Sequence, residues 1–286
     1  MPPIATFSIV AYDPARQEWG VAVQSKFLAV GAVVPHARAG VGAVATQSYA
    51  NPTFGPRGLA ILEAGGSPEA VREAFLRTDP EIHLRQFGVV DQSGASATFT
   101  GEGCHGWAGG VAGENLAAQG NLLAGPEVVE ALVETFRARD DLPFPERLLA
   151  ALHAADQAGG DRRGRQSAAL LVVAEGRGYG GLSDRWIDLR VDDHPDPVPE
   201  LARLLEIHRL FFEPAGEPEP LSEADLAWLA ELLVQTGDLA EPESGWSPRL
   251  EAALKALLGR ENLEMRYRGG PALEPEVLAY LKRRYA

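Results

Sequence analysis

The chain has 286 residues, of which 45% are hydrophobic and 23% are charged, and its formal net charge is −14. This length suffices for one large core and a small second one. The acidic balance is shared by residues 1–212 (−8) and 213–286 (−6), so phosphate would be repelled and nucleic acid is excluded as a partner. The single cysteine, Cys104, excludes an internal disulfide.

The start of the chain lacks the basic and apolar regions of a secretion signal. No apolar run reaches the length needed to cross a bilayer, so no membrane partner is expected and the expected location is the cytoplasm. The His, Cys, Asp and Glu residues do not recur at the spacing of metal ligands, and no cofactor-binding motif is present. Neither a metal nor a cofactor is therefore expected.

The predicted elements begin with a β-hairpin. Residues 6–12 and 19–24 alternate between apolar and polar as strands do, and Asp13-Pro14 opens the turn between them. A third strand is predicted through residues 41–45. Two helices follow, one beginning at Gly55-Pro56 and one capped by Ser67.

The same order then repeats toward the middle of the chain. A second hairpin is predicted at residues 86–90 and 95–100, and a further strand at 116–118. Two helices then begin at Pro126 and at Pro145. Two closing strands, 168–173 and 186–191, and a helix at 199–212 follow. Short turns make neighbouring strands antiparallel, and apolar helix faces need sheets to cover. The pattern therefore predicts an α+β fold, a four-layer αββα sandwich of two sheets between two helix layers.

A boundary is predicted at residues 213–220, where alternating Pro and Glu favour an extended spacer. Three helices are predicted after it, beginning at Ser222, at Ser247-Pro248 and at Pro275. Leucines follow one face of the first of these helices, as expected for a small core. The domains are thus 1–212, a sandwich, and 221–286, a small all-α domain.

Five segments of the first domain resemble the signature segments of an uncharacterised bacterial family. They are residues 6–11, 20–27, 40–47, 119–121 and 164–169. The family is domain-of-unknown-function family 1028, which is placed with the N-terminal-nucleophile (Ntn) hydrolases. The resemblance implies the same four-layer αββα sandwich, and it names no substrate.

The resemblance also implies a nucleophile. Ntn hydrolases use an N-terminal Thr, Ser or Cys whose own α-amine, with a pKa of about 7.7–8.0, is the general base. Thr6 is the candidate if residues 1–5 are removed, and its hydroxyl would attack an amide carbonyl to form an acyl-enzyme that water hydrolyses. A nearby cation would disfavour protonation of the amine. Arg38, similar in position to a lysine of proteasome-type members, and Lys26 are the two candidates.

The remaining site residues are implied by the same family pattern. Backbone N–H groups near Thr46 and Gln47 would form an oxyanion hole. Gln119, Gly120 and Asn121 lie where the family has supporting polar groups, as does Ser167. The expected substrate is an unidentified small amide or peptide.

Three other motifs are better explained by structure than by a catalytic or ligand-binding role. Cys104 and His105 would point to opposite faces of an extended strand, so they form no thiolate pair. Residues 159–164 are typical of a helix C-cap and a loop rather than a phosphate cradle. The acidic run at residues 192–196 is typical of helix N-terminal caps rather than of a metal site.

The tail, residues 221–286, resembles the peptidoglycan-binding domain that some members of the family carry. Peptidoglycan fragments are therefore an expected partner, and a dimer contact competes equally as the role of this domain. An alternative to the hydrolase is a non-catalytic binding or assembly protein that kept the sandwich and lost processing. Relatives with this sandwich fold usually form oligomers, so a homo-oligomer is expected.

Overall fold

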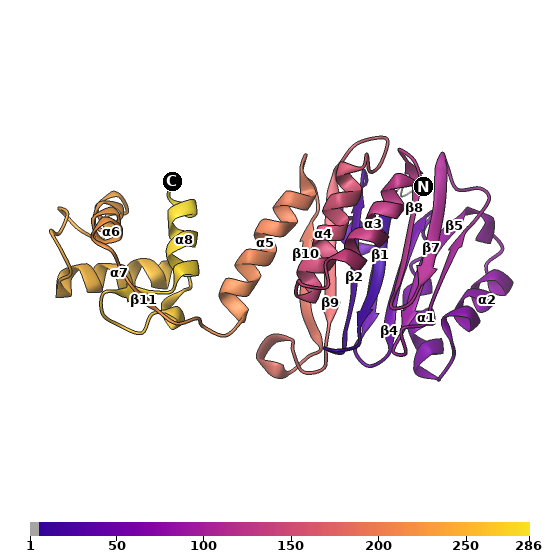
Figure 1. The fold of residues 1–286 in the computed structure, drawn as a ribbon, viewed down its shortest axis with the longest axis horizontal. Helices are drawn as coiled ribbons and strands as arrows, with labels where there is room; N and C mark the ends of the chain where they lie inside the picture. Colours follow the sequence, from indigo (N-terminus) through magenta and orange to yellow (C-terminus); the bar gives the residue numbers. More distant parts are fainter. Residues whose placement is uncertain (1–5) are drawn as a thin grey trace. The chain divides into compact units, whose positions relative to one another are not determined.

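The computed structural model describes residues 6–286 (Figure 1). The leader assigned above, residues 1–5, lies outside the described residues. The chain divides into two compact units between residues 205 and 206, and each unit is described by itself. Within residues 6–286, no helix is long and apolar enough to cross a membrane.

The first unit contains a six-stranded antiparallel sheet that is built around the predicted hairpin. In spatial order its strands are β10 (Arg185–Val191), β9 (Ser167–Val173), β2 (Glu18–Ser25), β1 (Thr6–Asp13), β8 (Leu116–Leu123) and β7 (Trp107–Gly113). The turn of the hairpin is held by Asp13, whose Oδ1 accepts hydrogen bonds from the N–H groups of Ala15 and Arg16. The hairpin brings together strands that are central in the sheet.

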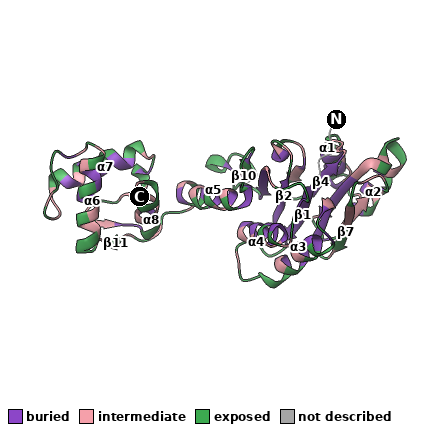
Figure 2. Ribbon diagram, turned by 90° about the horizontal axis from the view of Figure 1, so that it is seen from above, coloured by how far each residue is buried: buried purple, intermediate pink, exposed green. Residues whose placement is uncertain are grey.

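A second, four-stranded antiparallel sheet faces the first. Its strands in spatial order are β3 (Pro35–Arg38), β4 (Gly42–Ser48), β5 (Arg85–Asp91) and β6 (Ser96–Thr100). Apolar side chains of both sheets, among them Val10, Val21, Ala45 and Val90, form a buried cluster between them. Figure 2 shows that buried residues dominate strands β1, β2 and β4.

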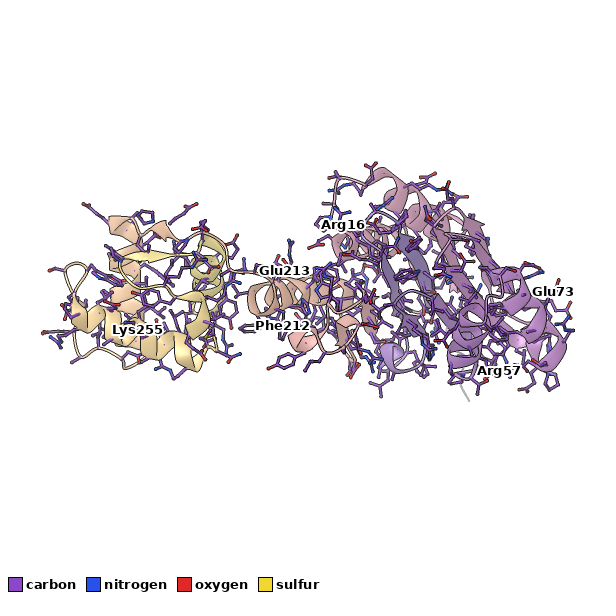
Figure 3. The ribbon with its side chains drawn as sticks, turned by 90° about the horizontal axis from the view of Figure 1, so that it is seen from below. Arg16, Arg57, Glu73, Phe212, Glu213 and Lys255 are labelled. Carbon is purple, nitrogen blue, oxygen red and sulfur yellow. The ribbon has the colours of Figure 1, made fainter. Side chains whose placement is uncertain are left out.

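Helices cover the outer face of each sheet. Helices α1 (Phe54–Glu63) and α2 (Pro68–Thr78) pack on the four-stranded sheet, where Phe54 and Phe75 stack with ring centroids 3.9 Å apart. The labelled side chains of Arg57 and Glu73 mark this pair in Figure 3. Helices α3 (Glu127–Ala138) and α4 (Phe144–Gln157) pack on the six-stranded sheet.

The predicted start of α2 is confirmed, because the Ser67 side chain accepts a hydrogen bond from the Ala70 N–H. Helix α5 (Pro197–Phe212) follows β10, and its Leu201 and Leu205 belong to the core of the first unit. Short 3₁₀ turns occupy Val30–Ala32, Ile82–Leu84, Tyr179–Gly181 and Glu264–Arg266.

The second unit is a small helical domain with a core of leucines. Its elements are β11 (Glu219–Pro220), α6 (Glu223–Gln235), α7 (Pro248–Arg260), β12 (Ala272–Leu273) and α8 (Pro275–Arg284). Ser222 forms a capping box with Asp225 at the start of α6, as its position predicts. The segment 213–220, predicted as a spacer, belongs to this unit, because β11 pairs with β12 and the Gly216 N–H donates to Glu274.

The sequence pattern missed four strands, β3 and β7 in the first unit and the two-residue strands β11 and β12 in the second. Strands β3 and β7 lie at the edge of a sheet, and β7 consists largely of glycine and alanine. Such residues carry little of the alternation by which strands are recognised. A mixed fold of helices and antiparallel sheets, as predicted, is confirmed.

Candidate active site

The register of the strands gathers polar side chains on the facing surfaces of the two sheets. Thr6 pairs with Ser25 on one side and with Asn121 on the other, and Ser8 pairs with Gln119. Phe7, between Thr6 and Ser8, points instead into the core under the helices. All members of this inter-sheet polar cluster are 0% exposed: Thr6, Ser8, Ser25, Gln47, Gln86, Gln119, Asn121 and Ser167.

Thr6 is the first residue of β1 and is held at both its hydroxyl and its carbonyl. The hydroxyl donates to the Ser25 Oγ at 3.0 Å. The carbonyl accepts from the Nε2 of Gln47, on the opposite sheet, at 3.2 Å. Both contacts are buried, where hydrogen bonds are electrostatically stronger than in water.

Ser8 links the two sheets through a chain of hydrogen bonds. Its hydroxyl donates to Gln47 Oε1 at 2.6 Å and accepts from Gln119 Nε2 at 2.7 Å. Gly88 on β5 leaves room for Gln119, because a Cβ there would lie 2.1 Å from the Gln119 Oε1. The predicted residues Thr6, Gln47, Gln119 and Asn121 therefore do meet in one place.

Gln86 is a member of this cluster that the sequence analysis missed. Its Oε1 accepts from Gln47 Nε2 at 2.8 Å and from Asn121 Nδ2 at 2.9 Å. The signal was present in the strand 86–90, where Gln86 occupies the same face as Gly88 and Val90. A glutamine on an inward face needs buried partners, and this is what singles it out.

Ser167 lies on the same face but serves a neighbouring loop. Its Oγ accepts from the Val30 N–H at 3.1 Å and donates to the Phe27 carbonyl. Ser167 is the register partner of Ser25 on β9. These two contacts therefore hold the turn after β2 rather than Thr6 itself.

The structure separates the two candidate cations. Arg38 pairs in register with Gly42 and forms an exposed ion pair with Glu63. Gln47, which contacts Thr6, is five residues further along β4 than Gly42, the register partner of Arg38. Arg38 therefore lies about 17 Å from the Thr6 end of β4. The strand register thus carries Arg38 away from the position that its sequence spacing suggested.

Lys26, in contrast, directly follows Ser25 at the Thr6 end of the sheet. Its N–H donates to the Asp161 Oδ2 at 3.0 Å and its Nζ to the Arg165 carbonyl at 3.1 Å. Asp161 is in turn paired with Arg163. Of the two predicted cations, Lys26 is the one whose backbone lies at the Thr6 end of the sheet, with its Nζ on the Arg165 carbonyl.

The expected oxyanion donors are already engaged in the sheet. The Thr46 N–H donates to the Val34 carbonyl at 3.2 Å, and the Thr46 side chain bonds to Asn51 on the helix side of β4. Gly120 presents its carbonyl to Gln86 at 2.7 Å. Thr46 is therefore unsuited to the predicted role, whereas Gln47 brings a side-chain N–H to within hydrogen-bonding distance of Thr6.

The backbone is strained beside the cluster. Ser48 and Leu122, which directly follow Gln47 and Asn121, have φ values of 67° and 57°. Leu122 is the extra residue of a β-bulge, because the register between β7 and β8 shifts there. A left-handed conformation costs roughly 1–2 kcal/mol in a residue other than glycine, and such strain gathers at functional sites.

The loop after β4 is anchored by a buried ion pair. Arg85 bonds to Asp79 at 3.0 Å and to the Tyr49 carbonyl at 2.6 Å, while Asn51 donates to Asp79 at 2.9 Å. Burial would raise the pKa of Asp79, but the hydrogen bonds from Arg85 and Asn51 outweigh it and the pKa is lowered. The carboxylate thus stays charged and fixes the loop.

Cys104 and His105 make no pair, as predicted. Cys104 Sγ lies against the carbonyls of Leu84 and Arg85, and burial raises the pKa of its thiol. His105 instead bonds through Nε2 to the Tyr49 hydroxyl at 3.2 Å. A thiol of raised pKa is a poor nucleophile. Across residues 6–286, no group of three His, Cys, Asp or Glu side chains is placed to hold a metal ion.

Comparison with known proteins places this domain in a family. The sequence model of the family of unknown function DUF1028 matches residues 6–201. The chain belongs to the DUF1028 family. The cluster lies wholly inside the matched DUF1028 region, since its members run from Thr6 to Ser167.

One solved member of the DUF1028 family is similar in structure. It is the crystal structure of protein SPO2555 from Silicibacter pomeroyi, which is 34% identical with a TM-score of 0.65. The match covers 72% of this chain and 89% of that chain. No curated protein sequence matches the chain.

Proposed function

We propose that this DUF1028 domain is an Ntn-type amidohydrolase that acts on a small amide or peptide. Thr6 would be its nucleophile once residues 1–5 are removed. The observation that carries the proposal is the position of Thr6. It is the first residue of a central strand, with its hydroxyl 3.0 Å from the Ser25 Oγ and its carbonyl held by Gln47.

The arrangement of layers supports the relationship to Ntn hydrolases. Helices α1 and α2 pack on one sheet and α3 and α4 on the other, with the sheets facing each other. This order corresponds to the αββα sandwich in which a nucleophile at the start of a strand is used. The strain at Ser48 and Leu122 points to the same end of the sheets.

The proposed reaction follows from a free amine at Thr6. The α-amine takes the proton of the Thr6 hydroxyl while the oxygen forms a bond to the carbonyl carbon of the substrate amide. The C–N bond of the substrate then breaks, the leaving amine takes the proton, and an ester to Thr6 remains. Water hydrolyses this ester. Lys26 is the cation that would keep the amine neutral.

The second unit would bind the material that contains the substrate. We propose that it binds peptidoglycan fragments, in keeping with the resemblance of residues 221–286 to such domains. A cavity of about 370 Å³ in this unit is lined by Arg209, Arg266, Tyr280 and Arg283, among others. The lining also contains Glu206, Glu213 and Glu276, and Arg209 and Arg283 pair with Glu213 and Glu206, so the cavity would offer both charges to a peptide. Titration of a soluble muropeptide into the full chain and into Arg283→Met tests this.

One observation favours a non-catalytic alternative. Thr6 is 0% exposed in the described state, and its surroundings in the cluster are neutral amides and hydroxyls. A buried, neutral and hydrogen-bonded cluster also serves to define how two sheets pack. In that case the protein would be a binding or assembly protein on the same scaffold.

The N-terminus of the purified protein distinguishes the two functions. Intact mass and N-terminal sequencing of the full-length gene product identify its first residue. The protein is then incubated with a β-lactone, an electrophile that acylates N-terminal threonines. The hydrolase predicts a chain that begins at Thr6 and is labelled there. Thr6→Ala abolishes the label, whereas Thr78→Ala, at an exposed threonine of α2, leaves it. An unlabelled chain that keeps its leader supports the alternative.

A further inference from the structure

We propose that Gln86 is a positioning residue, which fixes the amide groups of Gln47 and Asn121 beside Thr6. The inference rests on the proposed function, and it adds a residue that was not among the predicted site residues. Gln86 acts on Thr6 indirectly. It acts through two side chains that approach Thr6 from different sheets.

The orientation of the Gln86 amide is decided by the backbone. Its Nε2 donates to the carbonyl of Gly120 at 2.7 Å, and it also lies 3.2 Å from the Gly109 carbonyl and 2.9 Å from the Thr100 Oγ1. Carbonyl oxygens only accept hydrogen bonds. The NH₂ group must therefore face them, and a flipped amide would set oxygen against oxygen.

Once this orientation is set, that of the neighbours follows. Gln86 Oε1 can only accept, so Gln47 and Asn121 must both turn their NH₂ groups toward it, at 2.8 and 2.9 Å. The oxygen of Gln47 then faces the other way and accepts from the Ser8 hydroxyl at 2.6 Å. Two backbone carbonyls of one sheet therefore fix the direction of the hydrogen bonds as far as the Ser8 hydroxyl of β1.

The consequence for Thr6 is a defined set of atoms around it. Gln47 Nε2, which Gln86 holds, also donates to the Thr6 carbonyl at 3.2 Å. Asn121, which Gln86 also holds, is the register partner of Thr6 on β8. With Gln86 in place, the NH₂ groups of both side chains have fixed directions, because every member of the cluster is buried away from bulk water.

Backbone strain supports the assignment independently. The two residues that Gln86 orients are each followed by a residue in the left-handed region, Ser48 and Leu122. The chain therefore adopts costly conformations directly beside both amides. Strain of this kind persists only where the surrounding contacts over-determine it.

Gln24 provides a matched control. Like Gln86 it is a fully buried glutamine, but it lies on the six-stranded sheet and its register partner is Phe7, so it faces the helices. Within the described part of the chain, neither atom of its amide has a hydrogen-bond partner. A change at Gln24 therefore tests the burial of a glutamine without the network.

The experiment compares Gln86→Met, Gln86→Glu and Gln24→Met with the wild type, each purified from the full-length gene. The first readout is the rate of β-lactone labelling at Thr6 between pH 5 and 8. We expect Gln86→Met to lower this rate about tenfold to a hundredfold, the range expected for a misplaced group, and Gln24→Met to leave it unchanged. Relative to the wild type at the same pH, Gln86→Glu should label almost as fast at acidic pH, where a neutral carboxyl still donates and accepts, and should fall behind as the carboxyl ionises.

The second readout is the pair of side-chain NH₂ signals of Gln47 and Asn121 in ¹⁵N NMR spectra. We expect both to shift and to exchange faster in Gln86→Met, and to stay in place in Gln24→Met. This readout needs no activity. Should Gln86→Met fail to fold, Gln86→Glu carries both tests through its pH dependence.

The outcomes separate the inference from the function it rests on. A labelled wild type together with Gln86→Met labelled at the same rate overturns the positioning role of Gln86 alone. An unlabelled wild type overturns the proposed hydrolase. In that case unchanged NH₂ signals in Gln86→Met overturn the inference as well, whereas shifted signals support the orienting contact.

Discussion

The hydroxyl of Thr6 donates a hydrogen bond of 3.0 Å to the hydroxyl of Ser25, its register partner on the neighbouring strand. Both side chains are fully buried between the sheets. The contact ties the first residue of β1 to the last residue of β2, next to Lys26. It therefore joins the candidate nucleophile to the segment that carries the candidate cation.

Removal of this acceptor should loosen the start of β1. We expect Ser25→Ala to lower the free energy of unfolding by about 1–2 kcal/mol, because a buried hydroxyl loses its partner. Urea unfolding measures the change, and Ser93→Ala, in an exposed turn, is the control. Equal stability of the two variants would show that the contact contributes nothing.

Replacement of Gln24 by an apolar residue should stabilise the protein. Its amide is fully buried and, among residues 6–286, without a hydrogen-bond partner, which costs about 1–3 kcal/mol. Gln24→Met keeps the length and removes the polar atoms, so stability should rise by about 1 kcal/mol. Gln119→Met, which loses the bond to Ser8, should have the opposite sign. A loss of stability in Gln24→Met, measured by thermal unfolding, would contradict the prediction.

Glu18 predicts a pH dependence of stability. Burial raises its pKa to about 7, from 4.5, against the opposing effect of Arg177 and with a smaller contribution from Asp13. The folded state therefore binds a proton that the unfolded state has released, and stability falls as the pH rises from about 4.5 to about 7. The shift corresponds to a loss of about 3 kcal/mol at most.

The test of this dependence uses Glu18→Gln, which does not titrate. We expect its free energy of unfolding to vary less than that of the wild type between pH 5 and 8, in urea titrations at each pH. Arg177 keeps a contact in the variant, because its guanidinium lies 3.3 Å from the centroid of the Trp186 ring. Identical slopes for the two proteins would remove Glu18 as the cause.

The second unit contains a buried ion pair whose loss should be costly. Arg266 pairs with Glu274, which is fully buried, and the N–H of Gly216 also donates to this carboxylate. Arg266→Met leaves the charge uncompensated and should destabilise the unit by about 3–5 kcal/mol. Arg268→Met, which breaks an exposed pair with Glu217, should cost less than about 1 kcal/mol. Hydrogen exchange of α8 amides distinguishes the two variants.

Much of the fold was predictable because its signals are local. The alternation in β1 and β2, with Asp13 at the turn, requires only neighbouring residues to be recognised. The caps at Ser67 and Ser222 depend on contacts three residues away. The DUF1028 segments, too, were recognisable as sequence alone.

The arrangement of the site was decided by the tertiary structure. Arg38 was a candidate through its similarity in position to a lysine of proteasome-type members and Lys26 was the other one, and only the pairing of β3 with β4 carries Arg38 to the opposite end of the strand. Likewise Thr46 and Gln47 are neighbours, but the faces of β4 point Thr46 toward Asn51 and Gln47 toward Thr6.

By itself, the sequence determined most of the strands and helices and several of the polar residues that lie between the sheets, among them Thr6, Gln47 and Gln119. The tertiary structure decided which of those residues meet, and it brought Gln86 between Gln47 and Asn121. The physical reason is that side-chain alternation is a property of one strand, whereas register and sheet stacking depend on partners far away in the chain.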